Sequence, residues 1–486
     1  MAATTTPKKR IDLLKGSPSP SLLPVALLKS AAAHTLSDPS IFVPGLAYGP
    51  DAGYAPLRES IANWLTSFYR SSSSSNPVTS DRVCITGGAS QNMGCLLSVY
   101  TDPHYTRNIW IIAPAYFLAF RIFEDAGFGV DGKMRAVPED EHGLDIQFLR
   151  AEMEKSEGSA KKKGWEHPKY KPDRPRAKVY KHVIYCVPTF ANPSSRTMSL
   201  DRRKALVRLA REFDALILAD DVYDFLQWEA EPGGEANTKV QERSDRKTTA
   251  HLPRIVDIDH DLDGGAERQG ADGFGNACSN GSFSKIAAPG LRVGWCEGTP
   301  KFAYGISQSG TTTSGGAPSQ LTSTYFHTLL TNPAAQQTLQ THIHTTLQPA
   351  YARRSTLLLS AITSHLVPLG FALPQPNRDI IGGYFAWLAL PSSLHCDAKT
   401  LARRCAEEEN VVIAGGNLFE VPGDADAERG TSFERNVRFC WAYEEEGLLE
   451  EGVERVGRVV RRMLEEQQQG RVEEAGFVVV EKDGTA

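Results

Sequence analysis

The segment Gly281-Ser-Phe-Ser-Lys-Ile-Ala-Ala-Pro-Gly-Leu-Arg-Val-Gly-Trp295 contains one lysine preceded by two hydroxyl residues and followed by an arginine seven positions later. Its glycines and Pro289 predict a tight irregular loop that leads into a strand. Such a loop can hold Lys285 away from solvent, where desolvation lowers the pKa of its amine and favours a nucleophile. Ser282 and Arg292 then offer hydroxyl and guanidinium donors to a phosphate dianion.

Short apolar runs rich in β-branched residues alternate with helical patterns along the chain. The pattern at Ser199–Asp214 places Leu206, Leu209 and Phe213 on one helical face, and Ser199 is the predicted N-cap. Strands that alternate with helices predict a mostly parallel sheet whose ligand lies at the carboxyl ends of the strands. The expected strands include residues 82–86, 108–113, 182–187 and 215–219.

Two aspartates and a tyrosine end one of these strands, in Ala215-Leu-Ile-Leu-Ala-Asp-Asp-Val-Tyr223. Acidic residues at a strand end are often an ordinary cap or turn. Because the carboxyl end of a parallel strand is also where ligands bind, Asp220 and Tyr223 are candidates for a site.

A glycine turn follows the first expected strand, in Ile85-Thr-Gly-Gly-Ala-Ser-Gln-Asn-Met-Gly94. The free N–H groups and the positive dipole end of a helix start bind phosphate. The segment lacks the full dinucleotide fingerprint, so the two glycines alone are a weak signal. Taken with the lysine segment, they predict a phosphate site centred on Ala89 and Ser90, with Gln91 as a neighbour.

In this order, the segments resemble the motifs of the class I/II, fold-type I aminotransferases, which use pyridoxal 5'-phosphate. The resemblance makes Lys285 the Schiff-base lysine and Asp220 the acid that faces the pyridine nitrogen, because the family spacing is Asp-x-x-Tyr. It makes Tyr223 a donor to the phenolic oxygen of the cofactor and leaves Asp221 a structural role. The residues that it assigns to the cofactor phosphate are Ala89, Ser90, Gln91, Ser282 and Arg292.

Two further matches lie beside the cofactor ring. The segment Tyr185-Cys-Val-Pro-Thr-Phe-Ala-Asn-Pro193 is similar to the family loop Tyr-x-x-Pro-x-x-x-Asn-Pro-x-Gly. The match makes Asn192 a second donor to the phenolic oxygen and a neighbour of the substrate, although Ser194-Ser195 stands where the family often has Thr-Gly. Tyr116, in Ala113-Pro-Ala-Tyr116, matches the aromatic residue that stacks on the ring, with a core tyrosine as the alternative.

Three matches concern the substrate and a second subunit. Arg438, in the strand-like run Arg435–Tyr443, matches the arginine that binds the substrate α-carboxylate as a bidentate pair. An exposed strand arginine is the alternative. Gly16 matches the glycine that lines the substrate entrance. Tyr48 matches the tyrosine that reaches the cofactor phosphate of the neighbouring subunit, which implies a homodimer.

The family implies an α/β fold with a large domain, in which helices flank a mostly parallel seven-stranded sheet. A smaller α+β domain is built from both chain ends. Two charged stretches, residues 155–178 and 228–280, are predicted to be insertions, and residues 254–258 within the second are predicted to form a strand. The predicted parts are an N-terminal arm with part of the small domain (1–47), the large domain (48–325) and the remaining small domain with a flexible tail (326–486).

The resemblance implies an aminotransferase that acts by a ping-pong mechanism. The sequence around Tyr48 and Lys285 is most similar to the 2-aminoadipate, kynurenine and aromatic group, particularly its fungal members. The default oxo acid of the family is 2-oxoglutarate. The alternatives are other reactions of the same cofactor, namely C–S bond cleavage or aminocyclopropane carboxylate synthesis. A regulator that binds the cofactor is the least favoured alternative, because the segment before Tyr48 lacks a basic DNA-binding helix.

Composition excludes other classes. The chain has 486 residues and a net charge of −5, and its 41% hydrophobic and 23% charged residues are typical of a globular protein. Without a concentrated basic face we expect no nucleic acid partner, and without a long apolar run no membrane span. Eight cysteines without a C-x-x-C pair predict reduced, mostly buried thiols, and neither they nor His342 and His344 indicate a metal. The default location is the cytoplasm.

Overall fold

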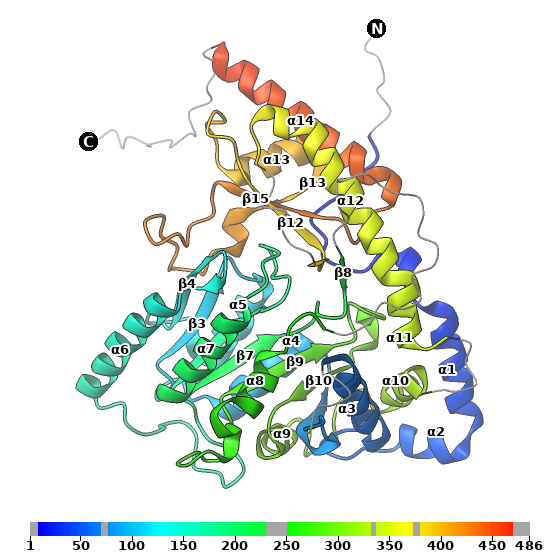
Figure 1. The fold of residues 1–486 in the computed structure, drawn as a ribbon, viewed down its shortest axis with the longest axis vertical. Helices are drawn as coiled ribbons and strands as arrows, with labels where there is room; N and C mark the ends of the chain where they lie inside the picture. The colour runs from blue at the N-terminus through cyan, green and yellow to red at the C-terminus, as the bar shows by residue number, and fades with distance from the viewer. Residues whose placement is uncertain (1–7, 70–75, 230–249, 332–336, 373–379, 470–486) are drawn as a thin grey trace, which may run out of the picture.

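The computed structural model describes residues 8–69, 76–229, 250–331, 337–372 and 380–469. A large sheet with helices on both faces forms the lower part of Figure 1, and a small sheet with long helices lies above it. We call these the large and the small domain. The boundaries predicted at residues 48 and 325 stay predictions, and the predicted tail lies, from residue 470 on, outside the described residues.

The large domain is built on an eight-stranded sheet in the order β2-β10-β9-β7-β6-β3-β4-β5. Strands β9, β7, β6, β3 and β4 are parallel, β10 is antiparallel to β2 and β9, and β5 is antiparallel to β4. The predicted mostly parallel sheet is confirmed, with eight strands instead of seven because a two-residue edge segment pairs back onto β4. The strands are β2 (Val83–Thr86), β3 (Asn108–Ala113), β4 (Met134–Asp140), β5 (Gly143–Leu144), β6 (His182–Cys186), β7 (Ala215–Asp220), β9 (Ala277–Ser282) and β10 (Gly294–Glu297).

Helices cover both faces of this sheet because successive side chains on a strand point to opposite faces. On β7, Leu216 and Leu218 join the core beneath α4, α5 and α9, whereas Ile217 and Ala219 join the core beneath α6, α7 and α8. The two cores make a three-layer α/β/α domain. The helices are α4 (Ala89–Tyr100), α5 (Leu118–Phe123), α6 (Ile146–Lys163), α7 (Leu200–Glu212), α8 (Ile255–Asp261) and α9 (Pro300–Ser307).

One helix start agrees with the sequence pattern and another corrects it. The Ser199 side chain accepts a hydrogen bond from the Arg202 backbone N–H, which makes Ser199 the N-cap of α7 as predicted. The strand predicted at residues 254–258 is wrong, because these residues begin α8. There the Asp257 carboxylate accepts from the Arg254 N–H at 3.1 Å, a local bond that favours a helix start.

Both predicted insertions contain regular secondary structure, which their charged composition does not indicate. Helix α6 extends into the first, to Lys163, because Leu149, Met153 and Ala160 form a buried stripe and Gly164 ends the helix in the left-handed conformation. In the second, residues 230–249 lie outside the described residues, and β9 begins at Ala277 in the centre of the sheet. The end of the second predicted insertion therefore belongs to the core.

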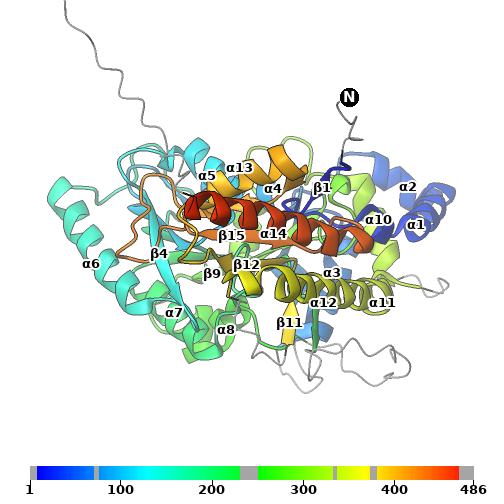
Figure 2. The same ribbon diagram turned by 90° about the horizontal axis from the view of Figure 1, so that it is seen from above.

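The small domain contains residues from both chain ends, as the family resemblance implies. Strand β1 (Ile11–Asp12) pairs in parallel with β13 (Val411–Val412), next to an antiparallel sheet in the order β12-β15-β14. Helices α12 and α14 run side by side over this part of the molecule (Figure 2). The remaining elements of the domain are β12 (Phe385–Ala389), β14 (Ala414–Gly415), β15 (Asn436–Cys440), α12 (Gln348–His365), α13 (Ala398–Glu409) and α14 (Glu446–Gln468).

Two further groups of elements are a two-stranded ladder and a cluster of packed helices. Strand β8 (Gln227–Glu229) pairs antiparallel with β11 (Ile380–Gly382). Helix α10 packs against α1, α2 and α3 at the lower right of Figure 1. The helices not yet given are α1 (Val25–Ser37), α2 (Pro39–Leu46), α3 (Ala55–Tyr69), α10 (Gln320–Thr331) and α11 (Leu339–His342).

Candidate active site

Lys285 lies in the loop that follows β9, with its amine turned into the molecule. Its Nζ donates to the Gly16 carbonyl at 2.6 Å and lies 5.8 Å from the ring centroid of Tyr223 and 5.5 Å from that of Tyr384. The Tyr384 hydroxyl donates to the Lys285 carbonyl at 2.9 Å and fixes the backbone of the loop. Burial lowers the pKa of Lys285 from 10.5 to about 8. The amine is therefore partly neutral near physiological pH, as a nucleophile requires.

Asp220 ends β7 and is buried, with both carboxylate oxygens bonded. Oδ2 accepts from the Tyr185 hydroxyl and Oδ1 from Asn280 Nδ2, each at 3.2 Å. Burial raises the pKa of Asp220 from 3.8 to about 7, opposed by these two bonds and by the positive charge of Lys285. A carboxylate that is desolvated in this way gains strongly from a protonated partner, which a pyridine nitrogen provides.

Arg438 lies on β15 and is only 2% exposed, so it is not an exposed strand arginine. Nη1 donates to Asn192 Oδ1 at 2.6 Å, and Nη2 donates to the Leu14 carbonyl. The guanidinium carbon lies 4.1 Å from the ring centroid of Phe385 and 4.8 Å from that of Phe419. Nε has no hydrogen-bond partner among the described residues. A buried guanidinium with an unused donor can bind a carboxylate.

The turn between β2 and α4 is a cradle that suits a phosphate. Gly88 has a φ of 94°, and a Cβ on it would lie 2.7 Å from Arg292 Nη2. Arg292 Nη2 donates to the Gly87 carbonyl at 2.7 Å, and the Gln91 side chain accepts from the Gly87 N–H at 2.9 Å. The first N–H groups of a helix have no partner within the helix. Together with Arg292 they form the donor set that a phosphate needs. These first-turn residues of α4 are Ala89, Ser90 and Gln91.

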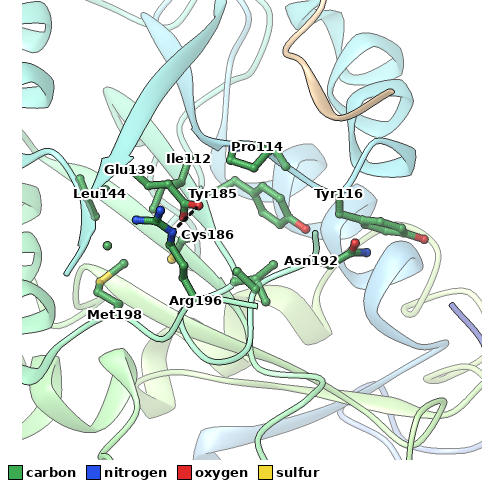
Figure 3. A pocket seen from close by; sticks show the side chains of 14 residues that line it. Ile112, Pro114, Tyr116, Glu139, Leu144, Tyr185, Cys186, Asn192, Arg196 and Met198 are labelled. Carbon is green, nitrogen blue, oxygen red and sulfur yellow. Dashed lines mark ion pairs between the residues drawn. The ribbon is translucent and has the colours of Figure 1, made fainter. Parts of the chain in front are cut away.

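Tyr116, Tyr223 and Gly16 also lie around Asp220 and Lys285. Tyr116 is half-buried, and its pKa is raised first by burial and then by the negative charge of Asp220. Figure 3 shows Tyr116, Tyr185 and Asn192 along one side of a cavity. A Cβ on Gly16 would lie 2.8 Å from Phe385 Cζ, so the close approach of this backbone requires glycine.

Ser282 and Tyr48, which the family resemblance assigns to the cofactor phosphate, differ in burial. The Ser282 hydroxyl is buried at the end of β9 and is hydrogen-bonded to Ser284 Oγ at 3.0 Å. Tyr48 is 90% exposed, and its ring lies near Gly315, where a Cβ would be 3.3 Å from it. Tyr48 is therefore a surface residue of its own chain. The roles of all these residues stay predictions.

The site contains residues that the sequence analysis did not single out. Tyr185 and Asn280 bind Asp220, while Phe385 and Phe419 enclose Arg438. Asn280 lies inside the predicted insertion 228–280, although it stands five positions before Lys285 in a buried run of small residues. Phe419 carried no signal, because it follows a glycine-rich turn far from every motif.

Neither a metal cluster nor a membrane helix occurs in the described ranges. No group of three or more histidine, cysteine, aspartate or glutamate side chains there is placed to hold a metal ion. Among the helices described, none combines the length and apolarity that crossing a bilayer requires. The eight cysteines are free thiols, and six of them are buried.

Comparisons with known proteins give the family. Residues 25–456 match the model of aminotransferase class I and II. The chain is 35% identical over 467 residues to the uncharacterized protein YER152C of Saccharomyces cerevisiae, covering 93% of this chain and 97% of that protein. It is 24% identical to aromatic-amino-acid aminotransferase 1 of Thermococcus litoralis, covering 93% and 88% of the two chains.

A solved structure shares the fold. The α-aminoadipate aminotransferase of Thermus thermophilus, complexed with N-(5'-phosphopyridoxyl)-L-leucine, has a TM-score of 0.68 and 24% identity, with 94% of this chain and 93% of that chain covered. The predicted α/β fold is therefore confirmed. The chain belongs to the aminotransferase class I and II family, enzymes that use pyridoxal 5'-phosphate.

Proposed function

We propose that this enzyme moves an amino group between an L-amino acid and a 2-oxo acid by a ping-pong mechanism. The donor is an aromatic amino acid or 2-aminoadipate, and 2-oxoglutarate is an acceptor. The observation that carries the proposal is that the half-buried amine of Lys285 interacts electrostatically with the buried carboxylate of Asp220 and the buried guanidinium of Arg438. The likeness to an aromatic and to an α-aminoadipate aminotransferase supports the donor class.

Lys285 is the catalytic base. When bound, pyridoxal phosphate supplies an electron sink for the electron pair left at the substrate α-carbon once its proton is removed. The Lys285 amine, with its pKa lowered to about 8 by burial, holds the cofactor between turnovers and takes the α-proton during them. Tyr384 keeps the lysine backbone in place through the bond to the Lys285 carbonyl.

Asp220 faces the ring nitrogen and keeps a proton on it. Its desolvated carboxylate is stabilised by that positive charge more than by the two neutral donors that it already has. With the cofactor bound, Tyr223 and Asn192 would donate to its phenolic oxygen, and Tyr116 would contact its ring. Asn192 accepts a hydrogen bond from Arg438 at 2.6 Å. From this position it also reaches the substrate carboxylate that Arg438 binds.

The cradle at the start of α4 holds the phosphate group. The N–H groups at Ala89, Ser90 and Gln91 point out of the first turn, and Arg292 neutralises the dianion beside them. Ser282 adds a hydroxyl at the end of β9. Tyr48 of a second copy of the chain donates its hydroxyl to the same phosphate.

Arg438 binds the α-carboxylate of both substrates. Its planar group is already held between the Phe385 and Phe419 rings, so little conformational freedom is lost when a carboxylate replaces the Leu14 carbonyl. Gly16 lines the entrance, because its carbonyl is bonded to the Lys285 amine that the substrate must reach.

The active enzyme is a homodimer. Large apolar side chains are exposed on the consecutive helices α1 and α2, where Val25 is 65%, Val43 58% and Leu46 64% exposed. Tyr48 follows α2 directly. An apolar surface next to a residue needed by a neighbouring site supports a second copy of this chain as its partner. A cytoplasmic location stays part of the proposal.

The proposal is tested by single half-reactions of the purified holoenzyme with a panel of amino acids. We expect aromatic amino acids or 2-aminoadipate to convert the cofactor to its pyridoxamine form, with one 2-oxo acid released per site and no ammonia. Lys285→Ala is the control and should leave the cofactor unchanged. Pyruvate with ammonia from a cysteine conjugate, or a cyclised product, would show instead that the enzyme carries out another reaction of the same cofactor.

A further inference from the structure

Asn280 lies directly opposite Asp220 on the neighbouring parallel strand. The two residues are register partners on β9 and β7. Asn280 Nδ2 donates both to Asp220 Oδ1 and to the Ala89 carbonyl, each at 3.2 Å. Its side chain is completely buried. One amide group therefore connects the candidate ring acid with the first residue of the helix that forms the phosphate cradle.

A second buried amide fixes the orientation of the first. Asn92, on α4, donates from Nδ2 to Asn280 Oδ1 at 2.8 Å and is also completely buried. If the Asn280 amide were reversed, its oxygen would face the Asp220 carboxylate and the Ala89 carbonyl, which are both acceptors. Asn92 therefore ensures that a donor, and not an acceptor, faces Asp220.

Buried amides are costly in an apolar sheet. Asn92 Oδ1 has no hydrogen-bond partner among the described residues, so the pair is not fully satisfied. The neighbours of Asn280 in the sheet include Cys278 on β9 and Cys296 on β10, which are both buried and weakly polar, so the amide of Asn280 is costly to desolvate there. The pair is better explained by its action on Asp220 than by a contribution to stability.

We propose that Asn280, oriented by Asn92, is a positioning residue that holds the Asp220 carboxylate ionised and aimed at the ring nitrogen of the cofactor. This inference rests on the proposed role of Asp220. Asn280 donates to one carboxylate oxygen and Tyr185 to the other, so the carboxylate cannot rotate. Both donors are neutral, which stabilises the negative charge without a second cation that would compete with the ring proton.

The substitution Asn280→Leu removes both N–H donors of the amide and keeps the branched shape of the side chain. With Tyr185 as the one donor left of the two, burial favours the protonated form of Asp220, which stabilises a proton on the ring less well. We expect the affinity of the apoprotein for pyridoxal phosphate to fall about 10- to 100-fold. The kcat should fall more than KM rises, because the substrate contacts of Arg438 are retained.

The decisive measurement compares two cofactors on the same apoproteins. The probes are pyridoxal phosphate and its 1-deaza analogue, in which carbon replaces the ring nitrogen, and the readout is the dissociation constant by absorbance titration. The wild-type chain should bind pyridoxal phosphate about 10- to 100-fold more tightly than the analogue. In Asn280→Leu the two dissociation constants should become nearly equal. A merely structural role would weaken both cofactors alike.

Two further variants make the result decisive. Cys278→Ala, a small core change on the same face of β9, should keep the full preference for the ring nitrogen. Asn92→Leu keeps Asn280 and should lose part of the preference for pyridoxal phosphate over the analogue. It therefore tests whether Asn92 orients Asn280, even if Asn280→Leu does not fold. The inference is overturned if Asn280→Leu or Asn92→Leu discriminates between the cofactors as well as Cys278→Ala does. Failure of the wild-type chain to bind either cofactor would instead refute the proposed function.

Discussion

Asn192 accepts a 2.6 Å hydrogen bond from Arg438, although 246 residues separate them in sequence. The first follows β6 of the large domain and the second lies on β15 of the small domain. The bond therefore sets the position of the predicted carboxylate-binding group relative to the ring-binding groups, and it makes the relative placement of the two domains part of the site.

Replacement of Arg438 by alanine should lower kcat/KM for amino acids about 30- to 5,000-fold, because the substrate carboxylate loses the partner of its proposed buried charge pair. The measurement is steady-state kinetics on a donor amino acid and on the matched amine that lacks the carboxylate. The amine should be transformed slowly by both proteins and lose little. Equal losses on the two donors would show that Arg438 acts on the fold and not on the carboxylate.

Gly88→Ala should lower the affinity for pyridoxal phosphate more than 10-fold. A loss of about 1.4 kcal/mol in binding free energy is enough for a factor of ten. The added Cβ would lie 2.7 Å from Arg292 Nη2, at a φ of 94° that side chains rarely adopt. Gly94→Ala on the same helix is the matched control, since nothing lies within 4 Å of its Cβ. The control should bind the cofactor normally; equal affinities of the two variants would argue against a phosphate cradle at this turn.

The stability of the apoprotein should depend on pH through Asp220. Burial raises its pKa from 3.8 to about 7, so the folded state binds more protons than the unfolded chain between these values. Stability is therefore lost as the pH rises through this window. Asp220→Asn should gain up to about 4 kcal/mol in free energy of unfolding above pH 7, and the gain should vanish near pH 4.

Urea unfolding of the two apoproteins across this range measures the difference. The control is Asp38→Asn, because hydrogen bonds from Ser40 lower the pKa of Asp38 and its loss should destabilise the protein. A gain for Asp220→Asn that does not change with pH would contradict the assignment of the titration to Asp220.

Capture of pyridoxal phosphate by the apoprotein should accelerate as the pH rises through about 8. Only a neutral amine adds to an aldehyde, and burial lowers the pKa of Lys285 from 10.5 to about 8. The rate is followed by quenching with borohydride at intervals, from about pH 6 to 10. A rate that still rises steeply near the ordinary lysine pKa would show that the reacting amine is exposed.

Much of the fold and the site could be predicted because the informative residues stand in short local patterns. The strands at residues 108–113 and 215–219 are continuous apolar runs, and Ser199 caps its helix as its sequence context indicates. The loop after β9 is marked by Pro289 and its glycines. Such features depend on near neighbours in the sequence and need no tertiary context.

One error missed a local capping bond, and the others arose where tertiary packing overrides composition. The strand predicted at residues 254–258 is a helix because one local bond from Arg254 to Asp257 begins it. Helix α6 continues through a lysine-rich stretch because three widely spaced apolar residues face the core. Asn280 could not be recognised from the sequence, since its importance comes from Asp220, which stands 60 positions away.

The central claim is that the Lys285 amine is the group that holds the cofactor. The most direct measurement is borohydride reduction of the holoenzyme, followed by mass spectrometry of its peptides. We predict one pyridoxyl adduct per chain, on the peptide that contains Lys285, and none after Lys285→Ala. An adduct on another lysine, such as the exposed Lys15 at the site entrance, or no adduct on a protein that transfers amino groups, would contradict the account.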